Sequence, residues 1–221
     1  MKLYEDDIAP NCRRVRLLLA EKGVEMAGEK MSVLEGDNLS EAYRAINPHG
    51  LVPSLELDDG STLWESTAIC RFLEAQYPEP CLMGADALET AKIEMWDRHT
   101  EFEGMAAVAE YFRNAVPPFK TRALPGHGDI AQIPALVERG KARAESYFRQ
   151  LDAPLAETEF LAGERFTYAD ITTMCVADFA LFTGLELPAD CTNLQRWFAA
   201  VSERPSAKAW PGMVERAAAA G

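Results

Sequence analysis

The stretch Asn47–Arg71, NPHGLVPSLELDDGSTLWESTAICR, has the pattern of a strand, a tight turn, a second strand and the start of a helix. Residues 54–57 alternate polar and apolar with the period of two that is typical of a half-buried strand. Asp58-Asp59-Gly60 supplies turn residues, because Asp tolerates unusual backbone angles and Gly adopts positive φ. Residues 62–64 form a short second strand. The stretch therefore predicts a β-hairpin that leads into a helix.

Two residue pairs in this stretch indicate more than a hairpin. Val52-Pro53 enters the first strand, where the N–H that a proline lacks costs least. Glu65-Ser66 precedes an apolar-periodic run, so we expect Ser66 to cap the helix and to leave backbone N–H groups facing a ligand. On their own, the same residues also fit a plain hairpin followed by a capped helix.

Together these pairs resemble the glutathione-binding signature of the glutathione transferase superfamily. The resemblance implies that Pro53 is cis and that the backbone of Val52 pairs with the cysteinyl part of glutathione, as a neighbouring strand would. It also implies that Glu65 and Ser66 bind the γ-glutamyl end. A helix N-terminus with a Ser hydroxyl suits the α-carboxylate, and a Glu carboxylate suits the α-ammonium group.

Composition and charge narrow the classes of partner. The chain has 221 residues, 22 Lys and Arg against 35 Asp and Glu, and a formal net charge of −13. Nucleic acids and anionic membrane surfaces require basic patches, so neither is an expected partner. A local group of arginines can still bind a small anion inside an acidic protein.

The cysteine pattern and the hydropathy indicate the compartment. The five cysteines are odd in number and scattered, without the spacing of metal ligands, which is typical of a reducing compartment. No apolar run is long enough to span a bilayer, and the start of the chain lacks a secretory segment. We expect a cytoplasmic protein without a metal.

The order of elements predicts two domains. Residues 1–78 read as β-α-β-α-β-β-α, a thioredoxin-like glutathione-binding domain, and residues 79–86 as a linker around Pro78-Glu79-Pro80. Residues 87–221 form an all-helical domain, so the fold class is α/β followed by an all-α bundle. A strand is expected near residues 29–34. The expected helices in the chain cover 10–22, 39–46, 85–115, 133–151, 168–182 and 194–203, with Ala217–Ala220 as a fraying end. In the first of these helices the polar residues Arg13, Arg14 and Glu21 lie on a different face from the apolar residues, and the four Trp residues, Trp64 among them, are expected in the core.

The second domain carries its own marker. Thr167 followed three residues later by Asp170 resembles a capping box, with an acid in place of the usual Glu or Gln. The superfamily carries this motif at the start of its core helix, where it serves folding. We therefore expect Thr167 and Asp170 to be structural.

The thiol-activating group is expected where the first strand meets the first helix. Ala9 stands where many relatives carry a Ser or Cys that acts on the glutathione thiol. Asn11 resembles the Asn of one bacterial group, whose amide approaches the sulfur and favours the thiolate. Cys12 is the alternative, either reactive at the helix N-terminus or simply packed. Backbone N–H groups acting alone are the third alternative.

Two further groups of site residues are expected, one for the glycine carboxylate of glutathione and one for the electrophile. Leu51 replaces the polar residue that many relatives use for the glycine carboxylate of glutathione, so His49 or Arg13 is expected to reach it instead. By the resemblance, the electrophile site lies between the first loop and the long helices after the linker. Our candidates there are Tyr111, Asn114 and Phe119, together with Phe112 and Arg113. Tyr111, Arg113 and Asn114 cannot all face one cleft, because neighbours on a helix point apart. His99 and Glu103 are further candidates for a base.

The predicted activity is that of a glutathione transferase, with glutathione as cosubstrate. It would add the glutathione thiolate to a small hydrophobic electrophile or reduce a mixed disulfide or peroxide. A non-catalytic glutathione-binding or interaction module of the same fold is the alternative, because Ala9 and Leu51 lack the usual polar groups. The resemblance also implies a homodimer.

Overall fold

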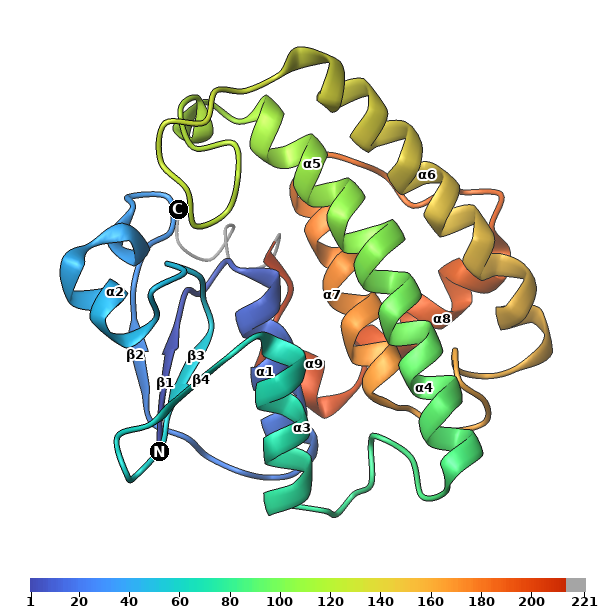
Figure 1. Ribbon diagram of the computed structural model, residues 1–221. Coiled ribbons are helices and arrows are strands. Elements are labelled where there is room, and N and C mark those ends of the chain that lie inside the picture. The colour runs from blue at the N-terminus through green and yellow to red at the C-terminus, as the bar shows by residue number, and fades with distance from the viewer. Residues whose placement is uncertain (214–221) are drawn as a thin grey trace.

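The first part of the chain forms a four-stranded sheet with helices on both faces. The computed structural model describes residues 1–213. Strand order is β2-β1-β3-β4, with β2 parallel to β1 and the other two pairs antiparallel. In Figure 1 the strands lie between α2 on one side and α1 and α3 on the other. The predicted thioredoxin-like order is confirmed, with the elements β1 (Lys2–Glu5), α1 (Pro10–Glu21), β2 (Gly28–Lys30), α2 (Glu41–Ile46), β3 (Ser54–Glu56), β4 (Thr62–Trp64) and α3 (Ser66–Gln76).

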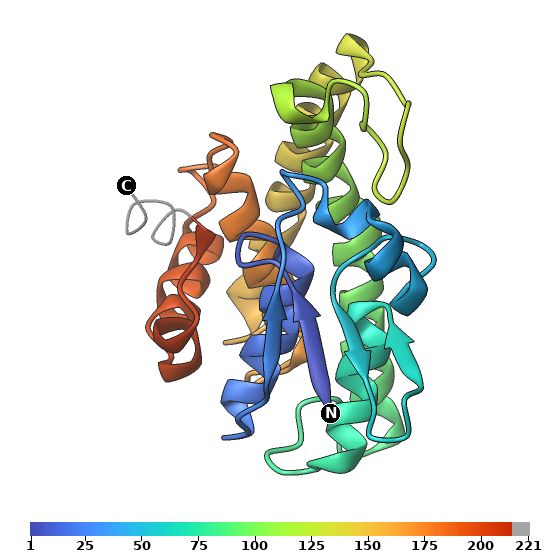
Figure 2. The same ribbon diagram turned by 90° about the vertical axis from the view of Figure 1, so that its left-hand side faces the viewer.

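The second part is helical, as predicted. Its helices are α4 (Ala87–His99), α5 (Ala106–Ala115), α6 (Pro134–Glu157), α7 (Tyr168–Phe182), α8 (Thr192–Ser202) and α9 (Pro205–Ala209). Helix α7 is buried along most of its length and packs against α1, which joins the two parts through one continuous core. Figure 2 shows the loop between α5 and α6, in yellow-green, descending beside α2. There the Arg44 guanidinium donates a hydrogen bond to the carbonyl of Gly126 (3.1 Å).

The capping box at the start of α7 is confirmed. The Asp170 carboxylate accepts hydrogen bonds from the backbone N–H of Thr167 (2.9 Å) and from its hydroxyl (3.0 Å). It also accepts from the N–H of Leu161 (3.0 Å) and from the indole of Trp197 (2.9 Å). A buried carboxylate with four donors fastens three segments of the helical domain together.

The helix predicted over residues 85–115 is interrupted. Between α4 and α5, residues Thr100–Met105 form a π-helical turn, in which hydrogen bonds span one residue more than in an α-helix. Gly104 in this turn lies against the Tyr147 ring of α6. A Cβ on Gly104 would come within 2.6 Å of that ring, so only glycine permits this approach.

Several local predictions were wrong. Arg13 and Arg14 were placed on the polar face of α1, but both are buried, because α7 and the turn after α4 cover that face. Ser66 is the first residue of α3, and Glu65 occupies the cap position. Trp64 was expected in the core, yet 42% of it is exposed.

The remaining differences concern element ends. The expected strand over residues 29–34 is confined to β2, and the expected helix from residue 39 begins at Glu41 after a 3-10 turn, Asp37–Leu39. Helix α6 extends to Glu157, beyond its predicted end at residue 151. The expected Ala217–Ala220 tail lies outside the described residues. Within residues 1–213, none of the helices has the length and apolarity needed to cross a membrane.

Candidate functional site

A cavity of about 450 Å³ lies between the sheet domain and the π-helical turn, α5 and α7 of the helical domain. The loop after β1, the segment Gly50–Pro53 and the start of α3 contribute its polar wall. The π-helical turn, α5 and the end of α7 contribute the opposite wall, and residues 125–126 of the loop after α5 form part of the rim. Both domains are therefore needed to enclose the site.

The backbone of Val52 provides an unused hydrogen-bonding edge. The Val52-Pro53 peptide bond is cis, and both residues line the cavity. Within residues 1–213, neither the N–H nor the C=O of Val52 has a hydrogen-bond partner. Unpaired backbone groups on a cavity wall are suited to an extended peptide that binds as a further strand.

The start of α3 provides the next part of the polar wall. Glu65 has a φ of 69°, a conformation that costs a non-glycine residue about 1 kcal/mol or more. Its carboxylate lines the cavity and has no hydrogen bond or ion pair with any residue that the structure describes. Ser66 follows as the first residue of the helix, where free backbone N–H groups favour an anion. A carboxylate beside a helix N-terminus is suited to a zwitterionic amino-acid group.

A buried ion pair holds this wall in place. The Arg14 guanidinium is fully buried and forms an ion pair with Glu101 of the π-helical turn. The same Nη1 donates to the hydroxyls of Ser66 and Thr67, each at 3.2 Å. Glu101 also accepts from Thr67 (3.1 Å) and from Arg98 (2.7 Å). These contacts connect the start of α3 to the helical domain through one charge network.

Asn11 and Cys12 occupy different environments. Asn11, in the first turn of α1, lines the cavity, and its side-chain amide has no hydrogen-bond partner in the described chain. Cys12 is buried, and its Sγ accepts from the backbone N–H of Asp6 (3.3 Å). Burial raises the pKa of the Cys12 thiol well above its ordinary value, so this sulfur stays protonated at neutral pH.

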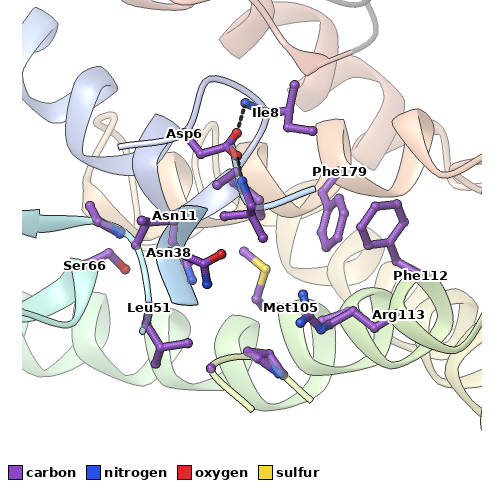
Figure 3. A pocket seen from close by; sticks show the side chains of 18 of the residues that line it. Asp6, Ile8, Asn11, Asn38, Leu51, Ser66, Met105, Phe112, Arg113 and Phe179 are labelled. Atoms are coloured by element: carbon purple, nitrogen blue, oxygen red, sulfur yellow. Dashed lines mark hydrogen bonds between the residues drawn. The ribbon is translucent and has the colours of Figure 1, made fainter. Parts of the chain in front are cut away.

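The opposite wall is aromatic. Phe112 of α5 contacts Phe119 edge-on at a ring-centroid distance of 5.3 Å, and it contacts Phe179 of α7 at 5.2 Å. Phe182 and Met105 complete this surface, which Figure 3 shows in part around Met105. An apolar surface of this kind suits an aromatic or otherwise hydrophobic molecule.

The structure does not bring every expected residue to the cavity. Among the electrophile candidates, Phe119 lines it, whereas Tyr111 and Asn114 do not, because their neighbours Phe112 and Arg113 occupy the cavity face of α5. The side-chain Oδ1 of Asn114 accepts from the N–H of Ile133 (2.8 Å) and thereby joins α5 to the start of α6.

The two residues expected to reach the glycine carboxylate lie outside the cavity lining as well. The His49 ring packs against Trp64 in a tilted arrangement, with a centroid distance of 4.4 Å and an interplanar angle of 55°. Arg13 forms an ion pair with Asp178 and donates to the carbonyl of Trp210 (2.9 Å). His99 and Glu103 are also absent from the lining.

The sequence did not point to Arg14 or Glu101 as parts of the site. The two residues are 87 positions apart, and neither belongs to a recognisable local motif. One feature could have indicated that Arg14 lies near the site. Arg14 follows Asn11 by three positions, and most residues of this helix are buried.

The fold and the cavity together define a glutathione S-transferase. Residues 3–81 match the model of the glutathione S-transferase N-terminal domain, and residues 103–205 match that of the C-terminal domain. The chain therefore belongs to this family. In the residues that the structure describes, no group of three or more His, Cys, Asp or Glu side chains is arranged to hold a metal ion.

Relatives with known names or structures agree over nearly the full length. Glutathione S-transferase 2 of Saccharomyces cerevisiae is 31% identical over 94% of this chain and 88% of that protein. A glutathione S-transferase domain-containing protein of Marinobacter aquaeolei is 37% identical, with a TM-score of 0.86 over 93% of this chain and 99% of that one. A class Gtt2 glutathione S-transferase of Vibrio parahaemolyticus is 38% identical, with a TM-score of 0.82 over 97% and 98%.

Proposed function

We propose that this glutathione S-transferase adds the glutathione thiolate to an apolar electrophile in the cavity between its two domains. The observation that carries the proposal is the division of the cavity into a polar wall and a facing aromatic wall. Val52, Glu65 and Ser66 belong to the first wall, and Phe112 and Phe119 belong to the second.

The tripeptide fits the polar wall in one orientation. Its cysteinyl backbone pairs with the free N–H and C=O of Val52. Its α-carboxylate lies at the N-terminus of α3 near the Ser66 hydroxyl, and its α-ammonium group lies at the unpaired carboxylate of Glu65. This orientation directs the sulfur toward the loop after β1, where Asn11 lines the cavity.

The thiol is activated by hydrogen bonding rather than by a covalent cysteine. The Asn11 amide donates to the thiolate, and the N-terminus of α1 adds a favourable field. The thiol proton leaves to solvent, and the sulfur lone pair forms the new bond to the electrophilic carbon. Either a leaving group then departs with its bonding electron pair, or the pair of a broken conjugated π bond takes up a proton from solvent. Burial of Cys12 weighs against disulfide exchange through that sulfur.

Binding and turnover test the proposal separately. Glu65→Ala and Ser66→Ala should each weaken glutathione binding by about 1–3 kcal/mol, because each leaves a charged group of the ligand without its partner. Calorimetric titration measures the change, and Glu65→Gln separates the loss of charge from the loss of volume. Unchanged affinity in both alanine variants would remove the site.

A non-catalytic glutathione-binding module is the second candidate, and Ala9 and Leu51 are the residues that favour it. Retention on a glutathione column without turnover of a chloronitrobenzene or of hydroxyethyl disulfide would support the module. Retention with conjugation of the chloronitrobenzene supports the transferase. Free cysteines throughout, all within the described residues, agree with a cytoplasmic location for either candidate.

A further inference from the structure

Among residues 1–213, Arg113 is the cationic residue that lines the aromatic end of the cavity. Figure 3 shows this side chain extending from α5 toward Met105, on the side of the cavity away from Ser66. The guanidinium carbon lies 4.3 Å from the centre of the Phe119 ring. Arg113 donates from Nε to the carbonyl of Ala123 (3.2 Å) and from Nη2 to that of Arg122 (3.0 Å).

The charge of Arg113 is not neutralised within the described part of the chain. Across residues 1–213, no carboxylate forms an ion pair with it, and its Nη1 has no hydrogen-bond partner. Burial, together with the neighbouring positive charge of Arg122, lowers the pKa of Arg113 to about 10. A partly buried cation without a counterion is costly, and it is unexpected in a chain with a net charge of −13.

Arg122 does not relieve this excess of positive charge. Within residues 1–213, its guanidinium donates to backbone carbonyls alone, among them those of Val33 (3.2 Å) and Leu34 (2.6 Å), and its central carbon lies 5.6 Å from the centre of the Phe119 ring. Two cations therefore flank one aromatic ring, and carbonyl dipoles rather than carboxylates face them. Such an arrangement favours an anion that arrives with a ligand.

The cavity lining carries acidic and basic side chains at different ends. Between these ends lies the Asp6 carboxylate, which accepts hydrogen bonds from the backbone N–H groups of Ile8 and Val33 (2.7 Å each). Glu65 and Glu101 lie at the end assigned to the γ-glutamyl group, where Arg14 offsets only Glu101. Arg113 lies among Phe112 and Phe119 at the other end. An aromatic molecule stacked at this end would bring a substituent at its far edge within reach of Nη1.

We propose that the electrophile of this enzyme is an aromatic or conjugated carboxylate, whose anionic group pairs with Arg113 while its ring packs on the phenylalanines. The inference rests on the proposed transferase function and adds the substrate class to it. The carboxylate takes no part in the bond changes. In an aromatic substitution, the thiolate sulfur bonds to the ring carbon, the carbon–chlorine bond breaks, and chloride leaves with the electron pair.

A matched pair of electrophiles tests the proposal. Chlorodinitrobenzene is neutral, and chlorodinitrobenzoate differs from it in an added carboxylate. Arg113→Gln removes the charge and keeps a donor for the neighbouring carbonyls. This variant should lower the ratio of kcat/KM for the benzoate to that for the neutral compound by about tenfold or more relative to wild type. Arg113→Lys should retain most of that ratio.

The control accounts for overall charge. Arg149→Gln removes an exposed arginine that pairs with Glu145 and Asp190 on the helical domain, and the ratio should stay at its wild-type value. An equal fall of kcat/KM for both electrophiles in Arg113→Gln would show that Arg113 only stabilises the loop that carries Phe119. A raised KM for glutathione with both electrophiles would assign Arg113 to the tripeptide. Either result overturns the proposal, as does an unchanged ratio.

A binding measurement keeps this inference separate from the proposed reaction. Dinitrobenzoate and dinitrobenzene lack a leaving group, so calorimetric titration of each reports affinity without turnover. We expect Arg113→Gln to weaken binding of the benzoate selectively, by about tenfold. If the wild type conjugates neither chloro compound, the transferase proposal fails, and the affinities still decide the role of Arg113. Equal affinities of wild type and Arg113→Gln for dinitrobenzoate would refute it.

Discussion

Replacing Asn11 by alanine should raise the pKa of the bound glutathione thiol. The Asn11 amide lines the cavity and has no partner within residues 1–213, so its N–H groups are available to the sulfur. A hydrogen bond to a charged acceptor contributes about 1.5 kcal/mol at the lower end of its range. Since one pKa unit corresponds to about 1.36 kcal/mol, the pKa should rise by about one unit in Asn11→Ala.

The shift has a kinetic consequence. Where the pKa lies above the assay pH, one unit lowers the thiolate fraction about tenfold, and turnover near neutrality should fall by the same factor. Activity should recover as the pH rises through the new pKa, because the thiolate then forms without the donor. The field of the α1 N-terminus remains in the variant, since no acidic side chain in its first turn opposes it.

Ultraviolet titration of the bound thiolate measures the pKa directly. Asn11→Asp is the shape-matched control, because it removes the donor and adds a negative charge, and we expect it to raise the pKa further. A titration curve in Asn11→Ala that coincides with the wild-type curve would refute the role of the amide. The backbone N–H groups of the helix start would then be the remaining candidate.

Three further outcomes are expected. Asp170→Asn should destabilise the fold by about 1–3 kcal/mol, measured by denaturant unfolding, because its amide turns a donor toward groups that are themselves donors. Burial raises the pKa of Asp170 above its ordinary value of 3.8, so wild type should gain stability as the pH falls through the raised value, and the asparagine variant should lack this gain. Cys12→Ser should keep the rate of conjugation within about twofold of wild type, because the Cys12 thiol is buried and protonated. For the same reason, mass spectrometry of the wild-type protein should find no glutathione adduct at Cys12. Light scattering should give twice 24.4 kDa, the mass of a homodimer. Met95→Glu should yield the monomer mass, because Leu88, Met95 and Phe102 recur every seven residues and are 66%, 58% and 64% exposed, as expected of an apolar contact surface. A wild-type mass of 24.4 kDa would contradict the homodimer.

The sequence predicted the features that depend on short segments. Three such features are the polar–apolar alternation before Asp58, the proline after Val52 and the capping box of Asp170. Each determines the backbone conformation of only a few neighbouring residues. Local backbone preferences determine such features, and all three agree with the structure. The order of strands and helices followed from the same signals.

The features that the sequence did not predict depend on contacts between distant segments. Arg14 carries a charge and was placed on the face of its helix away from the apolar residues, yet Glu101 reaches it from the other domain and makes its burial possible. Phe179 lies on the core helix, and nothing in its neighbourhood distinguishes a residue that faces the cavity from one that faces the core. Such assignments require the relative placement of the domains.

The π-helical turn between α4 and α5 determines which side chains of this helical segment face the cavity at its two ends. Arg113 follows Glu101 by twelve positions, and in an uninterrupted α-helix the two side chains would point about 120° apart, at about 100° per residue. The turn absorbs about one extra residue and so cancels about 100° of this difference, which brings both residues onto one face. The backbone hydrogen bonds of this turn thus determine the directions in which Glu101 and Arg113 point relative to each other around the helix axis. A relative with one residue fewer in this turn would present different side chains to its electrophile, even with every other residue unchanged.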